Sequence, residues 1–75
     1  MRELAPLVTV DQGVAFGKPV IRGTRVPVAL VIAKLAGGMS KAEVASEYDL
    51  QEQDILAALS YAAEVLKDEQ ILATA

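Results

Sequence analysis

From residue 27 onward, apolar residues recur at intervals of three and four, which is the pattern of helices that bury one face. The segment Pro27–Ala36 is rich in Val and Ile, so a strand competes, but its length and the following Gly37-Gly38 favour a helix. Ser40 and Glu43 have the spacing of a capping box, which marks the start of a second helix. The pattern therefore predicts three helices, over Pro27–Ala36, Lys41 to about Tyr48, and about Glu52–Lys67.

Each predicted helix has an apolar stripe that we expect in the core. The first two helices contribute Val28, Val31, Ile32 and Leu35, then Val44, Ala45 and Tyr48. The third contributes Ile55, Leu56, Leu59, Ala62, Ala63 and Leu66. The first helix is apolar nearly all round except at Lys34, which indicates burial on more than one side, in its own core or against a second copy. We expect a homodimer interface at Val28, Leu30, Val31 and Ala33.

The residues before the helices predict β-structure. Leu7–Val10 has the pattern of a short strand, and residues 20–26 that of a β-hairpin. The segment Val14–Gly17 between them is irregular, and we expect its aromatic residue, Phe16, to fill part of the core. Together these elements predict a mainly α fold, with a three-helix, helix-turn-helix-like core after an N-terminal strand and hairpin.

No linker, repeat or low-complexity segment divides the chain, so we expect a single domain over residues 1–75. Its parts are the strand and hairpin at 7–26, the trihelical core at 27–67 and a tail at 68–75 that the pattern does not assign.

The hairpin contains the most specific candidate for binding chemistry. Gly23-Thr24 fits a two-residue turn of type II′, in which Gly takes the position with positive φ. In that register Arg22 and Arg25 lie opposite each other with their side chains on one face. Adjacent guanidinium groups repel, so the arrangement predicts a bridging anion, either a phosphate or a partner's carboxylate. The alternative is that these arginines and Lys18 are solvated residues that keep the hairpin soluble.

Composition limits the classes of function. The 75 residues include no Cys and no His, and the acidic residues lack metal-ligand spacings, so we expect no disulfide, metal, cofactor or catalytic centre, and no enzyme. A chain this short forms a marginal core, yet 53% of its residues are hydrophobic, which favours a homodimer. No apolar leader precedes the first strand, and the longest apolar run, Val26–Ala33, is too short to cross a bilayer. We therefore expect a cytoplasmic protein with no membrane association.

Charge is divided unevenly between the two halves of the chain. Residues 1–41 have a net charge of +4 and residues 42–75 a net charge of −7, within a total of −3. The total argues against non-specific nucleic-acid binding, whereas the basic half leaves specific binding open. In a DNA-reading helix-turn-helix, exposed residues of the third helix would face the phosphates. Here they are acidic or neutral: Gln51, Glu52, Gln53, Asp54, Ser60 and Glu64.

Four motifs follow one another along the chain. They are Gly-Lys-Pro-Val-Ile-Arg-Gly-Thr-Arg-Val-Pro-Val at residues 17–28, Gly-Met-Ser-x-x-Glu-Val at 38–44, Tyr-x-Leu at 48–50 and Asp-Ile-x-Ala-Ala-Leu-x-Tyr-Ala at 54–62. In this order they resemble the domain-of-unknown-function 433 family of small prokaryotic proteins. The resemblance implies a trihelical fold of the homeodomain-like or winged-helix sort. It also implies a VapB-like antitoxin, which is encoded beside a PIN-like nuclease toxin.

Two classes of function follow from these observations. The first is an antitoxin that neutralises a PIN-like nuclease and binds operator DNA; the second is a stand-alone helix-turn-helix-like DNA-binding regulator. A structural dimerisation module is the third possibility. In either binding class, the candidate residues toward a partner or nucleic acid are Lys18, Arg22, Arg25, Lys34 and Lys41.

Overall fold

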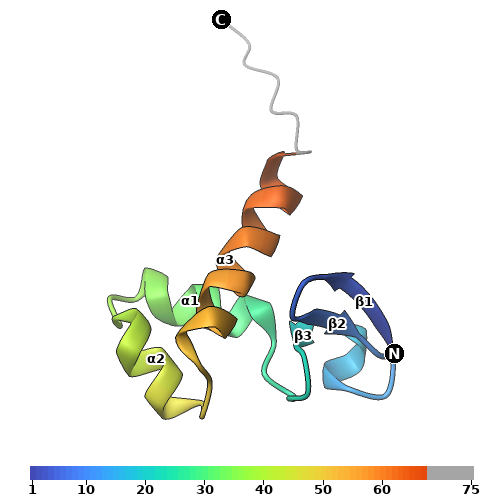
Figure 1. The fold of residues 1–75 in the computed structure, drawn as a ribbon, viewed down its shortest axis with the longest axis horizontal. Coiled ribbons are helices and arrows are strands. Elements are labelled where there is room, and N and C mark those ends of the chain that lie inside the picture. The colour runs from blue at the N-terminus through green and yellow to red at the C-terminus, as the bar shows by residue number, and fades with distance from the viewer. Residues whose placement is uncertain (68–75) are drawn as a thin grey trace, which may run out of the picture.

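Three helices and a small antiparallel sheet make up the protein, which confirms the predicted mainly α fold (Figure 1). The computed structural model describes residues 1–67, and the predicted tail lies outside the described residues. The strands are β1 (Arg2–Ala5), β2 (Val8–Val10) and β3 (Val20–Ile21), and a single 3-10 turn, η1 (Ala15–Gly17), precedes β3. The helices are α1 (Val28–Ala36), α2 (Lys41–Glu47) and α3 (Glu52–Lys67).

The sheet has the order β1-β2-β3, and its outer strand β1 is not predicted by the sequence pattern. The segment Arg2–Ala5 lacks the β-branched residues that are typical of strands. It is extended because it pairs with β2, where Glu3 lies opposite Thr9, and a bulge precedes Ala5. On the other side of β2, Val8 lies opposite Ile21 of β3. Cross-strand pairing therefore creates an element that local propensity does not.

The helix ends follow the local signals in the sequence. The Ser40 hydroxyl accepts a hydrogen bond from the Glu43 amide at 3.1 Å, and a Glu43 carboxylate oxygen accepts one from the Ser40 amide at 2.9 Å. Hydrogen bonding to the Glu43 carboxylate from the Ser40 amide, and to a lesser extent from the Ser40 side chain, lowers the pKa of Glu43 below its usual value, because it favours the charged carboxylate. The capping box thus confirms the predicted start of α2. At α3, the Asp54 carboxylate accepts a bond from the Gln51 amide at 2.9 Å.

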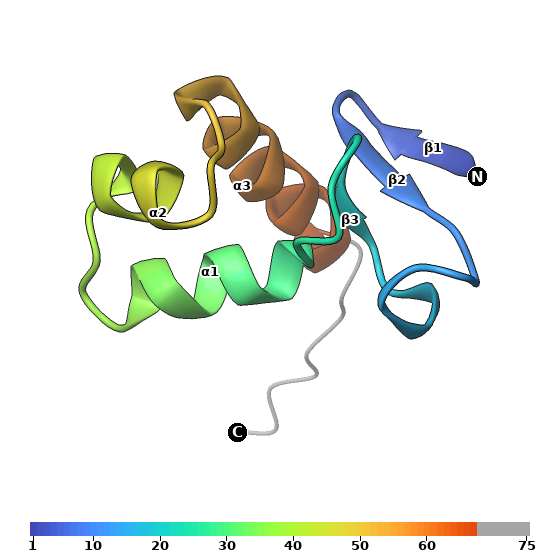
Figure 2. The same ribbon diagram turned by 90° about the horizontal axis from the view of Figure 1, so that it is seen from below.

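The core lies where the sheet meets the N-terminal half of α3 and the inner faces of α1 and α2. Figures 1 and 2 place the sheet at one end of the molecule and the α1–α2 connection at the other. The buried cluster contains residues from both parts: Val8, Ile21, Val28, Val31, Val44, Leu50, Ile55 and Ala58. Since β2, β3 and all three helices contribute to one cluster, the sheet and the helices form one packed unit.

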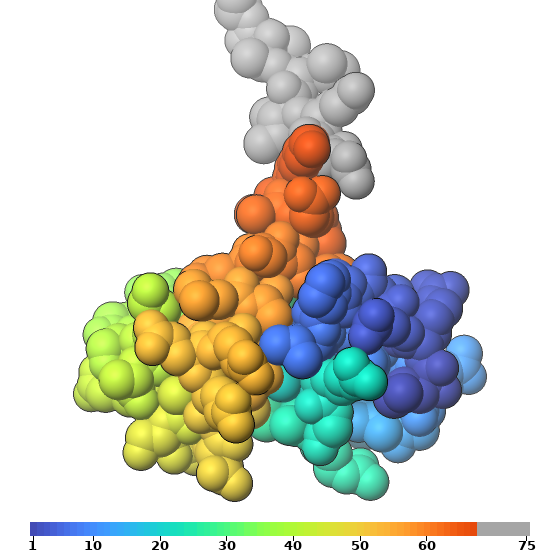
Figure 3. Space-filling model, in the orientation of Figure 1, coloured from blue at the N-terminus to red at the C-terminus, as the bar shows by residue number. Residues whose placement is uncertain are grey.

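The predicted stripe of α3 is only partly correct. Ile55 is fully buried, whereas Leu56, Leu59 and Leu66 are exposed. Leu66 is exposed because the last turns of α3 extend beyond the rest of the fold, as the projecting orange segment in Figure 3 shows. Leu56 directly follows the buried Ile55, so it lies on a face of the helix that the core does not cover. Helical periodicity marks an apolar face, but it does not say how much of that face a neighbouring element covers. Within residues 1–67, none of the helices is long and apolar enough to cross a membrane.

Candidate partner-binding surface

A hydrogen-bonded turn over residues 21–26, which we call the arginine turn, connects β3 to α1 and displays the two candidate arginines, Arg22 and Arg25. The Thr24 amide and hydroxyl both donate to the Ile21 carbonyl, at 3.0 and 2.8 Å, and the Val26 amide donates to the Thr24 hydroxyl at 3.0 Å. The Ile21 amide in turn donates to the Val26 carbonyl at 2.9 Å. Gly23 has a φ of 77°, as the sequence predicted for a glycine in the turn. These bonds hold the connection in one conformation.

The predicted type II′ turn about Gly23-Thr24 is wrong in its position. The closing bond runs from the Thr24 amide to the Ile21 carbonyl, so Gly23 is the third residue of the turn. A positive φ at the third residue is the requirement of a type II turn. In the observed turn the Thr24 hydroxyl also accepts the bond from the Val26 amide.

Arg22 has an internal counter-ion that the sequence pattern did not reveal. Its guanidinium group lies 3.5 Å from a carboxylate oxygen of Glu3 on β1, and both side chains are more than half exposed. The Arg22 amide also donates to the Leu7 carbonyl at 2.8 Å, which fixes the turn against the β1–β2 connection. An external anion that bridges Arg22 and Arg25 would therefore have to displace Glu3 from Arg22. Arg25 is exposed, and among residues 1–67 it forms no ion pair.

The remaining candidate cations do not form one cluster with the turn. Lys18 is exposed directly after η1, and it precedes the turn by a few residues along the chain. Lys34 is half-buried in the last turn of α1, and Lys41 is exposed at the first residue of α2. Because α1 rises about 1.5 Å per residue, Lys34 lies roughly 9 Å along the helix axis from the start of α1. The structure thus separates Lys34 and Lys41 from the arginine turn by the length of α1 (Figure 2).

The predicted dimer residues are also divided by the structure. Val31 is fully buried in the core of the same chain, so it is not available to a second copy, and this part of the prediction is wrong. Val28 is also a core residue, with 5% of its surface exposed, and it lines an apolar groove at the surface. Leu30 is half-buried and Ala33 is exposed. The physical reason is that α1 packs against both α2 and α3, which cover the face that contains Val28 and Val31.

An apolar groove with a volume of about 530 Å³ runs between α1 and the second half of α3. Lys18 is its one charged lining residue, and Pro19 lies next to it. The remaining lining residues come from the two helices: Val28, Ala29, Ile32, Ala33, Tyr61, Ala62, Val65 and Leu66. Val65 and Leu66 are 48% and 61% exposed, so the groove continues onto the projecting end of α3. We call these residues the α1–α3 groove.

The loop between β2 and β3 places Phe16 in solvent, which corrects the expectation that it fills the core. Its side chain is fully exposed. Ala15, Phe16 and Gly17 have φ values of 50°, 57° and 79°, so three consecutive residues adopt left-handed backbone conformations. Such a conformation costs roughly 1–2 kcal/mol for each residue with a side chain. The loop therefore holds the aromatic ring outward at a conformational cost.

Hydrogen bonds within this loop hold its backbone. The Val14 amide donates to the Asp11 carbonyl at 2.9 Å, and the Gly13 amide donates to the Asp11 carboxylate at the same distance. The Gly17 amide donates to the Val14 carbonyl at 3.0 Å. The pattern Gly-x-x-x-Gly around Phe16 is the one sequence signal of this tight loop. The loop leaves no path for its central side chain to reach the core.

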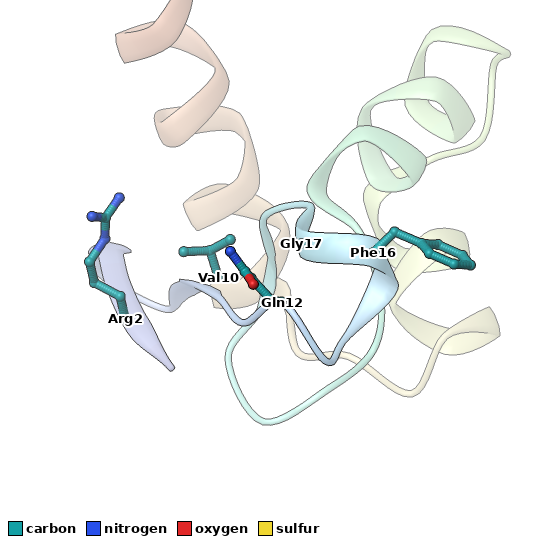
Figure 4. Close-up of a pocket in the computed structure, with 5 residues that line it drawn as sticks. All are labelled: Arg2, Val10, Gln12, Phe16 and Gly17. Carbon is teal, nitrogen blue, oxygen red and sulfur yellow. The ribbon is translucent and has the colours of Figure 1, made fainter.

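Beside the loop lies an open hollow of about 740 Å³, lined by Arg2, Val10, Gln12, Phe16 and Gly17. Figure 4 shows Arg2 at one end of the hollow and the ring of Phe16 at the other, pointing away from Val10 and Gln12. No carboxylate is among the lining residues, so the charge of this surface comes from Arg2. Together, the arginine turn, the α1–α3 groove and the Phe16 loop are the candidate contact surfaces of the protein.

The pattern that describes the family called "Protein of unknown function (DUF433)" matches residues 8–62, nearly three quarters of the chain. The chain belongs to the DUF433 family. The match includes the arginine turn, all of α1 and α2, and most of α3, so the candidate surfaces lie largely within the family domain. No curated protein matches the chain.

Two solved structures are similar to this DUF433 chain. A DUF433 member protein from Anabaena variabilis is 29% identical with a TM-score of 0.75, over 81% of this chain and 61% of that one. Rv2018 from Mycobacterium tuberculosis is 33% identical with a TM-score of 0.64, over 69% of this chain and 24% of that one. The present chain therefore spans less than two thirds of either protein.

Proposed function

We propose that this protein is a VapB-like antitoxin: a binding protein that neutralises a PIN-like nuclease encoded beside it. The observation on which the proposal rests is Arg25, which is exposed on a hydrogen-bonded turn and has no acidic partner among residues 1–67. The membership of the DUF433 family adds the expectation of a nuclease neighbour. A cytoplasmic location follows from this proposal, because both the toxin and its operator are cytoplasmic.

The proposed mechanism is competition for the nuclease's carboxylates. PIN-like nucleases hold divalent metal between clustered carboxylates, and a guanidinium group pairs with carboxylates through two parallel hydrogen bonds. Arg25 lies on a short hydrogen-bonded turn, so its backbone loses little conformational freedom on binding. Arg22 joins it by exchanging Glu3 for a carboxylate of the nuclease. That exchange costs little free energy, since an ion pair between two side chains that are 58% and 54% exposed contributes at most about 1 kcal/mol.

The test is inhibition of the neighbouring PIN-like nuclease by purified variants. We expect Arg25→Ala to weaken binding by about 30-fold or more, because truncating one member of a desolvated charge pair costs roughly 2–5 kcal/mol. Lys67→Ala is the matched control, since Lys67 is an exposed cation in the last turn of α3 and is not among the candidate residues. Unchanged inhibition after both Arg25→Ala and Arg22→Ala would show that the arginine mechanism is wrong. Failure of the unmodified protein to bind the nuclease would refute the function itself.

Operator binding is the second part of the proposal, and the packing of α2 and α3 against α1 supports it. In the usual docking mode the second helix of the motif enters the major groove, but Glu52 and Gln53 are exposed at the start of α3 and Asp54 caps it. Phosphate contacts are therefore assigned to the arginine turn, Lys34 and Lys41. Retention on the protein's own promoter DNA should fall steeply with salt. DNA binding without any nuclease binding would favour a stand-alone regulator instead.

We also propose that the protein is a homodimer, with the α1–α3 groove as its contact surface. The projecting end of α3 exposes Val65 and Leu66 beside the groove, so a two-fold arrangement covers both helix ends at once. Charge favours a second copy as the occupant. Lys18, in the basic half of one chain, lies at the groove that receives the acidic α3 of the other, where Glu64 is exposed.

The mass of the protein in solution tests the dimer. We expect twice the chain mass for the unmodified protein and the chain mass for Leu66→Glu, which adds a charge to the groove. Leu56→Glu is the control, because Leu56 is a similarly exposed residue of α3 outside the groove. A monomer at millimolar concentration, or dissociation by Leu56→Glu alone, would contradict the assignment. If the protein forms no dimer, no nuclease complex and no DNA complex, all three proposed roles are refuted.

A further inference from the structure

Phe16 combines an exposed aromatic ring with a strained backbone conformation. Its aromatic ring is fully exposed, although it is the only Phe of the chain and one of three aromatic residues. Its backbone has a φ of 57°, a conformation that disfavours side chains, and Ala15 and Gly17 on either side share it. Strained backbone conformations persist where the surrounding structure enforces them, and they cluster at functional sites.

The backbone of the loop is held in one conformation. Four hydrogen bonds close it between Asp11 and Lys18, with lengths of 2.9 to 3.2 Å. A backbone that is already ordered loses little conformational freedom when its side chain binds a partner. Aromatic residues, Phe included, are enriched in the buried centres of protein interfaces.

The surface beside the loop is cationic and polar. Arg2 and Gln12 line the adjacent hollow, with Arg2 at the end away from the ring (Figure 4), and Lys18 follows the loop as an exposed residue. The one acidic side chain of the loop, Asp11, accepts the bond from the Gly13 amide and does not line the hollow. A partner that fits this surface has an apolar pocket for the ring and carboxylates at the rim for Arg2 and Lys18.

We infer that Phe16 is an anchor residue that inserts into an apolar, acid-rimmed pocket of the nuclease described under the proposed function, on which this inference rests. A protein pocket fits the shape better than a nucleic acid does. Single-stranded nucleic acids stack on several aromatic side chains along a basic groove. Here one ring stands alone at the tip of a convex loop, and Tyr48 and Tyr61 pack against the core. Phe16 and Arg25 are then two separate contacts with one partner.

The experiment measures the affinity of the purified neighbouring PIN-like nuclease for the full chain and its variants by calorimetry. Phe16→Ala should weaken binding by about 30-fold or more, the effect of losing a dominant interface residue. Phe16→Leu should recover part of the affinity, because it restores apolar volume. Arg2→Ala should weaken binding less, since it lies at the rim. Leu56→Ala is the matched control: it removes an exposed apolar side chain that lies outside the loop and the hollow.

A second measurement follows the ring directly. With para-fluorophenylalanine at position 16, the fluorine resonance should shift and broaden when the nuclease is added, because the ring passes from water into a protein pocket. An unshifted resonance in a saturated complex, or equal affinity of Phe16→Ala and the unmodified protein, overturns the inference while the proposed function stands. Absence of any complex overturns both. A labelled 20-nucleotide single-stranded RNA whose binding needs Phe16, with the nuclease complex unaffected, would assign the ring to nucleic acid and also overturn it.

Discussion

Replacing Phe16 by glycine should make the protein more stable, although it deletes the largest side chain of the loop. The ring is fully exposed, so its removal breaks no packing. The φ of 57° at this position is strained for a side chain and free of strain for glycine. Relief of a left-handed conformation is worth roughly 1–2 kcal/mol, and the greater freedom of glycine in the unfolded chain removes about 0.5–1 kcal/mol of that gain.

The expected net effect is therefore an increase of about 1 kcal/mol in the free energy of unfolding. For a domain of this size, that corresponds to a rise in Tm of roughly 4–8 °C. The matched variant is Phe16→Ala, which removes the ring but keeps a Cβ atom at the strained position. It should leave the stability within about 0.5 kcal/mol of the unmodified protein, as exposed substitutions do.

The assay is urea and thermal denaturation followed by circular dichroism at the helical band, for the unmodified protein and both variants. The difference in free energy of unfolding between the glycine and alanine variants measures the backbone strain at position 16. The difference between the alanine variant and the unmodified protein measures the contribution of the ring. Equal stability of the two variants would refute the strain at Phe16. A loss of more than about 1 kcal/mol in Phe16→Ala would show that the ring packs against the fold. A glycine variant that is more stable but no longer binds the nuclease would demonstrate that the loop trades stability for recognition.

Four further predictions concern the fold around the candidate surfaces. Ile55→Ala, at a fully buried position of α3, should lower the free energy of unfolding by about 2–5 kcal/mol in urea denaturation; a loss below 1 kcal/mol would contradict the described core. Ser40→Ala should lower it by about 1 kcal/mol through loss of the cap. The bond from the Ser40 amide lowers the pKa of Glu43 in the folded protein, so the contribution of that carboxylate is complete above the unfolded value of 4.5 and is lost as pH falls through the folded value. The stability gap between Glu43→Gln and the unmodified protein should therefore narrow in acid, and a pH-independent gap would argue against this bond. Glu3→Gln should change stability by less than about 0.5 kcal/mol, since its ion pair with Arg22 is exposed, and it should not weaken nuclease binding; a clear loss of affinity would mean that the pair orients Arg22 for the partner.

The helices and their ends could be predicted from the sequence because their signals are local. Apolar spacing, the Ser40 and Glu43 capping box and the Gly37-Gly38 stop each act within one or two turns of chain. The glycine of the arginine turn was predicted for the same reason, since its positive φ depends on immediate neighbours. The ordered motifs from residue 17 onward likewise placed the chain in its family.

The pairing of Arg22 with Glu3 was decided by the tertiary structure alone. Nothing in Arg2–Ala5 has the pattern of a strand, and only the register with β2 brings Glu3 beside the turn, about twenty residues away in sequence. The burial of two predicted dimer residues could not be seen in the sequence for a related reason. Periodicity shows that α1 is apolar on several sides, but α2 and α3 determine which side is covered, and they cover Val28 and Val31.

Phe16 is the opposite case, because it was expected in the core and is exposed. Its hydrophobicity predicted burial, because transfer of an aromatic ring out of water is favourable. Hydrogen bonds within the Asp11–Lys18 loop nevertheless impose a left-handed backbone that turns the ring outward. Composition and periodicity thus determined which segments are helical and where they begin, because those preferences belong to short stretches of chain. The exposed ring, the paired arginine and the open groove depend on contacts between distant segments, which exist only once the sheet and the helices have packed.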